Sequence, residues 1–589
     1  MIRAQMASRP TVMDSDANSA LTPRNFAVLV ALAVVLLGVL AYVNTFDGEF
    51  VWDDVSSILL HQHVRSPAKI AHLFTEDQHA FAGGQGNFYR PLLSVSFMLD
   101  YVASTIGESR PDPTITPLDL GTFFFHLSST LWHVAAALFL LALMHRLGAP
   151  RPVQAIVPLV YVVHPLHTEA VAYISGRGDS MSAAFIFAGL YFATWHETRR
   201  RRHAGLALTL LCFAAGLLSK ESTLIFPALL LLGVLLVFPR SGTGSILGRW
   251  LPFSASLVLL GVYSALRLTV LNFGSDSTAP DTTFVEGIRA TLQAFGLYIG
   301  LIFAPVGLHM ERSLAEVPTY VAAIGLVLLA ACLALIVIAV KKGHPRAGFA
   351  MAWFVIAWLP ISGVFPLNAP MAEHWMYVPL AGFLWAAAEV LYAALTMSDG
   401  RPRKIALTYA AAALVTLWMA GLLALTMERN RDWHDNESIY TATLRESPDS
   451  TRVHFNLAVT YDDLLQNPYG ARRHYEAVTR IYRDRKDEDP ALQGQFWSEE
   501  LEAYRSLGDI YLDQRFIGEA FSLYRIVLSA QPKDGNLALQ AAATYGMGRC
   551  YLATGDRERA LQQFEGALKV LPYLRPEIDE LLAKSAPMG

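Results

Sequence analysis

Residues 318–340 read PTYVAAIGLVLLAACLALIVIAV, and the basic pair Lys341-Lys342 follows directly. The run carries no charge and exceeds the roughly twenty apolar residues that a helix needs to cross the hydrocarbon core of a bilayer. Lipid admits only segments whose backbone hydrogen bonds are satisfied internally, so the run predicts a transmembrane helix. The fold therefore depends first on how many such runs the chain contains.

Ten further segments are long and apolar in the same way. They are 26–44, 121–145, 152–174, 181–198, 203–219, 222–239, 250–271, 347–367, 376–397 and 404–427. The first lacks a cleavage site of small residues, so it is expected to be an uncleaved span rather than a signal peptide. Composition agrees, because 53% of the residues are hydrophobic and only 16% are charged, against about a quarter in soluble domains. The prediction is an all-α, polytopic membrane bundle of about eleven spans.

Positive charge in short loops predicts the orientation of the spans, because such loops stay in the cytoplasm. The basic loops are 145–151, 199–202, 240–249, 341–346 and 401–404. They share one side only if the apolar segment 287–304, which ends at Pro305, is re-entrant or interfacial rather than a full crossing. We adopt that interpretation, which places the N-terminus inside and the C-terminal residues outside.

Three domains follow from this topology. Residues 1–25 form a cytoplasmic tail, 26–427 form the membrane domain with a long outer loop at 45–120, and 428–589 form a water-soluble domain. The soluble domain is predicted to face the periplasm in a bacterium or the lumen of the endoplasmic reticulum in a eukaryote.

The soluble domain contains tetratricopeptide repeats (TPR). In residues 500–533 a Leu-Gly-x-x-Tyr pattern is followed by Ala, an aromatic residue and a closing Pro, as that repeat requires. The residues that carry the pattern are Gly508, Tyr511, Ala520, Tyr524 and Pro532, with Gly548, Tyr551, Ala560, Phe564 and Pro572 in the second copy and a looser copy at 452–484. An α-solenoid of this kind commonly presents a concave peptide-binding face; the alternative is a structural cap that binds nothing.

Polar clusters follow the ends of the predicted spans, and this topology places nearly all of them on the outer face. They are Asp53-Asp54, Tyr89-Arg90, His164, His167, Arg177, Lys220-Glu221, Arg312 and Glu373-His374. Ionisable groups at membrane depth are costly, so their gathering at one rim indicates a functional site. Carboxylates beside cations suit a reaction in which a carboxylate removes a proton while cations hold a phosphate.

Each cluster also has a purely structural interpretation. The pair Asp53-Asp54 would mark the solvated exit of a span, and Arg90 would reach toward lipid headgroups. Lys220-Glu221 would form a salt bridge in a turn. Their shared position on one face favours the functional interpretation over these separate ones.

The sequence gives little support for a metal site or a nucleic-acid-binding site. His164 and His167 have the i, i+3 spacing of a metal pair, but no third ligand is evident, so packing or hydrogen bonding is favoured. No cofactor is predicted, although the oxygen ligands of Asp53-Asp54 leave a divalent ion open. A net charge of −4 without a basic stripe argues against nucleic acid, and the three cysteines form no disulfide or metal-binding pattern.

The ordered motifs resemble the transmembrane and tetratricopeptide-repeat protein O-mannosyltransferases and their bacterial relatives, which have the GT-C glycosyltransferase fold. The resemblance covers nearly the whole chain from residue 40 onward. It rests on FVWDD at 50–54, YRPL at 89–92, HPLHTEAVAYISGR at 164–177, SKES at 219–222, APVGL at 304–308, AEHWMYVPLAGF at 372–383 and RNRDW at 429–433. The chain departs from the family in the insert at 103–120 and in its short repeat array.

The resemblance implies a hexose, mannose first, moving from a polyprenyl-phosphate carrier to an acceptor hydroxyl on the outer face of the bilayer. The general base would be Asp53 or Asp54. The donor phosphate would be neutralised by Arg90 and Lys220 first, and then by Arg177 and Arg312. The remaining members of the donor site would be Tyr89, Glu221, His164, His167, Glu373 and His374.

Two other functions and several acceptors stay open. The acceptor is expected to be Ser or Thr of a protein, with the repeats able to bind it, while a glycan or lipid acceptor is the alternative. A non-catalytic scaffold for envelope polysaccharide or secretion assembly would also need an anchored repeat domain. A lipid-linked-glycan transporter would favour charges at mid-membrane, where Arg267 is the main example.

Overall fold

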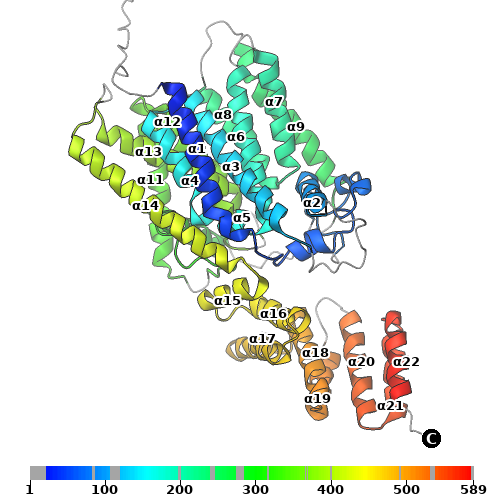
Figure 1. The fold of residues 1–589 in the computed structure, drawn as a ribbon. Helices are drawn as coiled ribbons and strands as arrows, with labels where there is room; N and C mark the ends of the chain where they lie inside the picture. Colours follow the sequence, from blue (N-terminus) through cyan, green and yellow to red (C-terminus); the bar gives the residue numbers. More distant parts are fainter. Residues whose placement is uncertain are drawn as a thin grey trace, which may run out of the picture. The chain divides into compact units, whose positions relative to one another are not determined.

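The computed structural model describes residues 22–81, 87–105, 120–196, 201–238, 246–273, 284–314, 317–364, 367, 369–397, 401–489, 492–530 and 537–585. Apart from an isolated bridge between Thr396 and Pro402, these residues contain helices and turns only (Figure 1). They form two compact units. The first comprises Met1–Val306 with Ser313–His434, and the second comprises Gly307–Arg312 with Asp435–Gly589.

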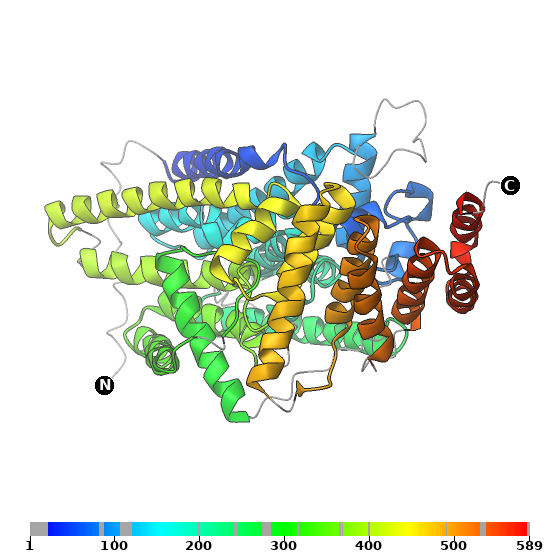
Figure 2. The ribbon, with the colours of Figure 1, turned by 90° about the horizontal axis from the view of Figure 1, so that it is seen from below.

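The first unit is the predicted helical membrane bundle. Among its described residues, six helical segments are long and apolar enough to cross a membrane: Arg24–Thr45, Phe123–Arg146, Arg249–Leu268, Tyr320–Lys341, His374–Leu395 and Ile405–Asp432. The helices that lie in the predicted spans are α1 (Pro23–Tyr42), α3 (Phe123–Arg146), α4 (Arg151–Val162), α6 (Gly178–His196), α7 (Arg202–Leu217), α8 (Phe226–Leu236), α9 (Ile246–Leu268), α11 (Tyr320–Lys341), α12 (Pro345–Trp358), α13 (Tyr377–Leu395) and α14 (Ile405–Asp432). Each of the eleven predicted spans thus contains a helix, and α14 runs beside α1 (Figure 2).

Several helices end earlier than the sequence suggested. The predicted span 152–174 stops at Val162, and short turns follow, including α5 (Thr168–Val171). His164 has an extended backbone and its side chain accepts a hydrogen bond from the backbone N–H of Leu166. Because the residue before a proline is disfavoured in the helical conformation, Pro165 ends the helix here. Likewise α12 gives way to a tight turn at Leu359–Ile361, which contains Pro360.

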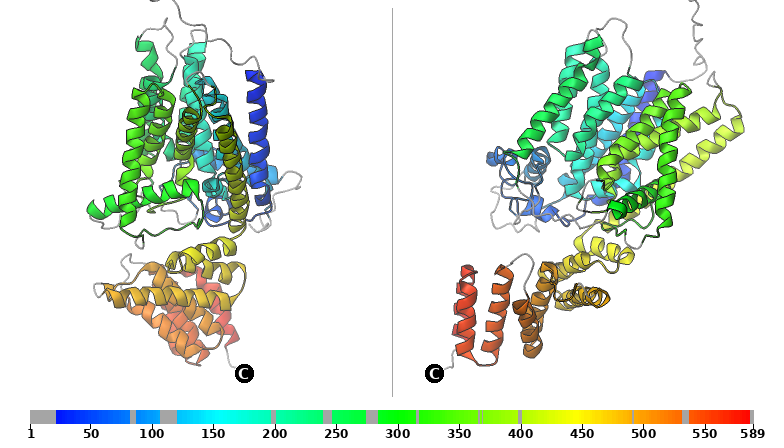
Figure 3. Two further views of the ribbon diagram at one scale, coloured as in Figure 1. Left: turned by 90° about the vertical axis from the view of Figure 1, so that its left-hand side faces the viewer. Right: turned by 180° about the vertical axis from the view of Figure 1, so that it is seen from behind.

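The segment assigned as re-entrant or interfacial forms one regular helix, α10 (Phe284–Phe303). Its contacts lie at one end of the neighbouring helices: Gln293 donates to the carbonyl oxygen of Val317, just before α11, and Phe295 packs on Trp358, the last residue of α12. Figure 3 shows α10 lying across the bundle at that end. This arrangement agrees with an interfacial helix and corrects the alternative of a re-entrant loop.

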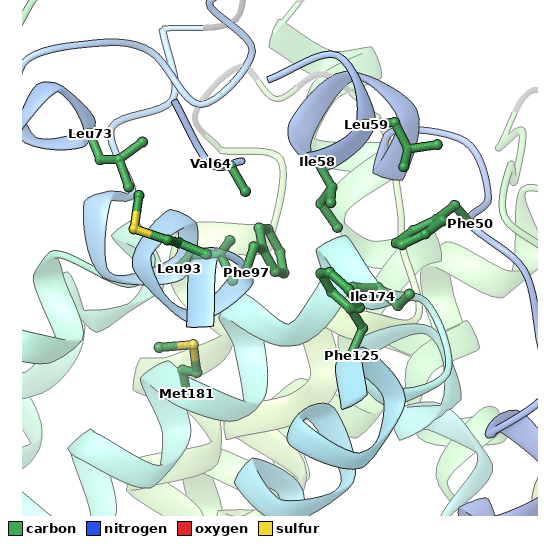
Figure 4. Close-up of a cluster of buried hydrophobic side chains, with 11 residues drawn as sticks. Phe50, Ile58, Leu59, Val64, Leu73, Leu93, Phe97, Phe125, Ile174 and Met181 are labelled. Atoms are coloured by element: carbon green, nitrogen blue, oxygen red, sulfur yellow. The ribbon is translucent and has the colours of Figure 1, made fainter. Parts of the chain in front are cut away.

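The outer loop is a folded layer rather than an open connection. It contains the helix α2 (Pro91–Ser104), which the sequence analysis did not predict, and several short turns. A buried apolar cluster joins this layer to the bundle (Figure 4). Its members are Phe50, Ile58, Leu59, Val64, Leu73, Leu93, Phe97, Met98, Phe125, Ile174 and Met181. Most of the insert at 103–120 lies outside the described residues.

The second unit is the predicted stack of helix pairs. Gly508 and Gly546 lie against the ring of Tyr524, and Gly548 lies against Phe564, so the small and aromatic positions of the repeat meet as expected. The helices are α15 (Asn436–Glu446), α16 (Thr451–Val459), α17 (Pro468–Glu488), α18 (Ser498–Asp513), α19 (Ile517–Ser529), α20 (Leu537–Ala553), α21 (Arg557–Leu568) and α22 (Arg575–Lys584). Pro532 lies outside the described residues.

Candidate active site

Polar residues from distant parts of the membrane unit meet at one end of the bundle. Asp54, after α1, bonds to Ser175, between α5 and α6. Arg90, at the start of α2, bonds to Glu221, between α7 and α8. Each of these bonds joins two predicted polar turns that are remote in the sequence.

Asp54 is an internal anchor. Its side chain is fully buried, and its Oδ1 accepts hydrogen bonds from the backbone N–H of Ser175 at 2.7 Å and from the Ser175 hydroxyl at 2.6 Å. Its Oδ2 accepts from the backbone N–H of Val51 at 3.1 Å. Burial raises the pKa of Asp54 to about 7, and these hydrogen bonds offset the rise only in part. A carboxylate with these partners fixes the loop and has no open face for a substrate.

Asp53 has different surroundings although it is the next residue. It is partly exposed, and its charge lies close enough to the Tyr173 hydroxyl to act on it. Trp52, just before it, has a φ of 50°, which is uncommon for a bulky residue and marks a constrained turn. That turn lets two adjacent aspartates face different environments, and Asp53 is the one that faces outward.

An aromatic stack supports this turn. Trp52 stacks on Tyr173, with ring centroids 5.7 Å apart, and Tyr173 stacks on Trp433 at 5.1 Å. The three rings come from the loop after α1, the turn before α6 and the end of α14. Offset aromatic stacking adds to apolar burial and favours one geometry. The stack therefore fixes the position of Asp53.

The two leading cation candidates are each held by a carboxylate. The Arg90 guanidinium donates to both oxygens of Glu221 and, at 3.4 Å, to Gln78. The Lys220 ammonium donates to Asp179 at 2.6 Å. Burial would raise the pKa of Glu221, but the charge and hydrogen bonds of Arg90 outweigh it and lower the pKa to about 2. Both cations keep further N–H donors for a ligand.

Arg177 and Tyr89 serve the fold instead. Arg177 is fully buried and donates to Ser129, Ser96, Asp100 and the carbonyl oxygen of Phe125. With its donors bonded to protein acceptors, this guanidinium holds α2 and α3 together. The hydroxyl of Tyr89 donates to the carbonyl oxygen of Phe74, inside the outer layer. Sequence reasoning could not separate these residues from Arg90, because the difference lies in their partners.

His164 and His167 are interior residues. His164 bonds to the carbonyl oxygen of Ile302, and His167 packs between the rings of Tyr161 and Tyr377. Within the described residues, the ring nitrogens of His167 have no hydrogen-bond partner. These positions agree with the structural interpretation of the pair. No group of three or more His, Cys, Asp or Glu side chains in the described part of the chain is arranged to hold a metal ion.

Glu373 and His374 belong to an ion-pair network with Arg429 and Glu169. His374 pairs with Glu169 at 2.8 Å, and Glu373 pairs with Arg429 at 3.4 Å. This network joins the turn after α4 to the start of α13 and the end of α14. Glu169 and Arg429 lie in the motifs quoted above but were not predicted as site residues.

Arg312 is placed in the other compact unit. It donates to the carbonyl oxygen of Gly307. Its predicted contact with the donor phosphate stays a prediction. The residues that sequence reasoning missed are Tyr173, Ser175, Asp179 and Trp433. All but Asp179 occur in the quoted motifs, and nothing in the sequence assigns their partners.

Curated relatives of this chain bear one functional name. A protein O-mannosyl-transferase of Caenorhabditis elegans is 22% identical over 475 residues, which are 77% of this chain and 62% of that protein. The human protein O-mannosyl-transferase TMTC4 is 22% identical over 536 residues, which are 80% of this chain and 68% of that protein. The Drosophila melanogaster protein O-mannosyl-transferase Tmtc1 is 29% identical over 313 residues, covering 49% of this chain and 34% of that protein.

The chain thus spans from about a third to about two thirds of the length of these relatives. Comparison with protein-family models finds no match, and comparison with the solved structures finds none either. Over most of its length the chain is therefore homologous to the transmembrane and tetratricopeptide-repeat protein O-mannosyltransferases.

Proposed function

We propose that this chain is a membrane glycosyltransferase that moves a hexose, mannose in the first instance, from a polyprenyl-phosphate carrier to a hydroxyl group of protein Ser or Thr. The observation that carries the proposal is the partly exposed Asp53, in a membrane unit that also holds Arg90 and Lys220, each bonded to a carboxylate. The names of the homologous proteins support the reaction class and a protein acceptor.

Asp53 is the proposed general base. Its carboxylate takes the proton from the acceptor hydroxyl, and the hydroxyl oxygen forms the new bond to the anomeric carbon of the sugar. The bond from that carbon to the phosphate oxygen breaks, and the carrier phosphate leaves with the electron pair. Attack opposite the leaving group inverts the anomeric carbon and needs no second carboxylate, because a phosphate leaves without protonation.

Arg90 and Lys220 are proposed to neutralise that phosphate. Charge-assisted hydrogen bonds to phosphate are stronger than neutral ones, and a guanidinium offers a rigid fork of donors. Glu221 and Asp179 orient the two cations and keep the unliganded site close to neutral. We propose a structural role for three of the predicted donor-site residues: Arg177, His164 and His167. The proposed donor site therefore has fewer residues than the one predicted from the sequence.

Asp54 is proposed as a positioning residue and not as the base. Its three hydrogen bonds join the loop after α1 to the turn that carries Tyr173, and Tyr173 lies against Asp53. The proposal also places the reaction on the outer face of the bilayer, and it has the repeats bind the acceptor.

The test is transfer from polyprenyl-phosphate mannose in membranes that contain the full chain. General-base catalysis contributes about 10²–10⁴-fold, so Asp53→Asn should lower the rate by at least about a hundredfold with normal amounts of folded protein. Glu49→Gln is the matched control, since Glu49 is an exposed carboxylate of the same loop. Undiminished transfer by Asp53→Asn would exclude the mechanism, and a non-catalytic scaffold would show no transfer in any variant.

A further inference from the structure

A cleft outside the catalytic cluster opens between the end of α1 and the end of α14. Its volume is about 550 Å³. The apolar side of the cleft consists of Val43, Phe46 and Met427, and the polar side includes Asp47 and Arg431. Figure 2 shows the two helices side by side. None of these residues takes part in the proposed transfer reaction.

Hydrogen bonds on two sides fix the walls of the cleft. On the membrane side, the Asn44 amide donates to the carbonyl oxygen of Met427, and the Asn430 amide donates to Asn44, both at 2.8 Å. On the outer side, the backbone N–H of Glu49 donates to the carbonyl oxygen of His434 at 2.7 Å. The cleft is therefore preformed, and a ligand would not have to order its walls.

The cleft carries opposite charges, because Asp47 and Arg431 both line it beside His434, and both are exposed. No ion pair between described side chains includes Asp47 or Arg431, although the charge of Asp47 also acts on His126. One ligand that carries both a cation and an anion would satisfy both side chains. A ligand with only one charge would leave the other side chain unpaired, at some cost in binding free energy.

The location of the cleft indicates a lipid. Arg24–Thr45 and Ile405–Asp432 are candidate spans, and only 28% and 11% of their apolar windows are buried inside the protein. Leu36 and Leu417 are each 69% exposed, so both helices present apolar faces to acyl chains. The charged residues come about one turn after the last apolar ones, at the depth of headgroups.

We propose that this cleft binds one phospholipid with a zwitterionic, primary-amine headgroup of the phosphatidylethanolamine type. The Arg431 guanidinium takes the phosphate, and the Asp47 carboxylate takes the ammonium. The acyl chains lie along Val43, Phe46 and Met427 and the exposed faces of the two helices. A polyprenyl-phosphate sugar offers no cation to Asp47, so this site is distinct from the proposed donor site.

The test measures lipid retention and does not depend on transferase activity. The purified full chain is reconstituted with equal amounts of phosphatidylethanolamine and phosphatidylglycerol, returned to detergent, and analysed for bound lipid by native mass spectrometry. The wild type should retain phosphatidylethanolamine in preference. Loss of one charge-assisted contact of about 1.4 kcal/mol corresponds to tenfold, so Asp47→Asn and Arg431→Gln should each lower retention about tenfold.

Two controls separate the site from general effects of charge at the interface. Lys404→Gln removes an exposed cation at the opposite end of α14 and should not change retention. Arg431→Lys keeps the charge and should retain more lipid than Arg431→Gln. Wild-type retention in both Asp47→Asn and Arg431→Gln would overturn the proposal. Equal retention of phosphatidylglycerol, unaffected by Asp47→Asn, would also overturn it, because the site would then recognise phosphate alone.

Discussion

Asp53 and Asp54 are adjacent in the sequence, but their carboxylates have different surroundings and therefore different chemistry. Asp54 is enclosed by the backbone of Val51 and by Ser175, whereas Asp53 faces outward beside Tyr173. A carboxylate that is buried and hydrogen-bonded on both oxygens stabilises a loop, and one that is accessible can accept a proton from a substrate. The division of roles follows from the turn at Trp52.

The raised pKa of Asp54 predicts a pH-dependent stability. Burial raises this pKa to about 7, against about 3.9 in an unfolded chain. The folded chain therefore binds the proton of Asp54 more tightly than the unfolded chain does. The contribution of this protonated carboxyl to the free energy of unfolding is fully present below about pH 4 and is lost as the pH rises through about 7. We expect the unfolding temperature of the wild type to fall between about pH 5 and about pH 8 relative to that of Asp54→Asn.

Thermal unfolding of both proteins in detergent, followed by tryptophan fluorescence at several pH values, measures this difference. Other titrating groups contribute equally to the two proteins, so only the difference matters. Parallel curves for wild type and Asp54→Asn would show that Asp54 has an ordinary pKa.

Two kinds of helix contact organise the elements. In the repeat unit, an aromatic ring fills the space left by glycines on neighbouring helices: Tyr524 lies between Gly508 and Gly546. In the membrane unit, α10 crosses α11 where Gly325 meets the backbone of Leu292. Small residues at a crossing allow close approach of two backbones, which is how helices associate in lipid.

Gly508→Ala should destabilise the repeat unit. The added Cβ would lie 2.6 Å from a ring carbon of Tyr524, in a packed layer where overpacking costs about 1–3 kcal/mol. Gly518→Ala, on α19, is the matched control, because nothing lies within 4 Å of its added Cβ. Hydrogen exchange of the full chain should show faster exchange in α18–α20 for the first variant only; equal exchange in both would contradict the packing.

Gly325→Ala should disturb the position of α10. The added Cβ would lie 1.9 Å from the carbonyl oxygen of Leu292, a backbone atom that moves only with its helix. Gly300→Ala, on α10 itself, meets nothing within 4 Å. The yield of monodisperse protein after detergent extraction should fall for Gly325→Ala and stay normal for Gly300→Ala; normal yield for both would argue against this crossing.

At the scale of the whole molecule, the homologous proteins and the apolar helices indicate an integral membrane protein. Interactions within the membrane unit separate two ends of the bundle. At one end Arg346, at the start of α12, pairs with Glu389 of α13. At the other end lie Asp53, Arg90 and the end of α14, after which the repeat unit begins. The chain therefore leaves the bundle at the end that holds the candidate site.

Cysteine labelling tests this topology. The native cysteines Cys212, Cys332 and Cys550 are buried, so they should give little background. Single cysteines at Thr75 and Tyr469 should react with a membrane-impermeant reagent from outside, and one at Lys342 should react only after permeabilisation. Labelling of the Thr75 and Tyr469 positions from opposite sides would separate the candidate site from the repeats and remove the basis of the proposed reaction.

Much of the architecture could be read from consecutive residues. Runs such as 318–340 indicate spans, and the Gly508 and Tyr524 pattern indicates repeats, because hydropathy and helical periodicity are local properties. The same reasoning predicted, through topology alone, that Asp53, Arg90 and Lys220 share one face of the bilayer. It did not predict α2, the early end of α4 at Pro165, or the course of α10 across the bundle.

The roles of the polar residues required the tertiary structure. Arg90 and Arg177 cannot be told apart by the residues next to them. Arg90 bonds to Glu221, which lies 131 residues further along the chain. Arg177 is instead enclosed by Ser96, Ser129 and Asp100. Burial and hydrogen-bond partners depend on contacts between remote segments, and these decide whether a charge supports the fold or meets a ligand. Local pattern thus predicts which helices form and where the chain turns, whereas long-range packing selects the chemistry of each side chain.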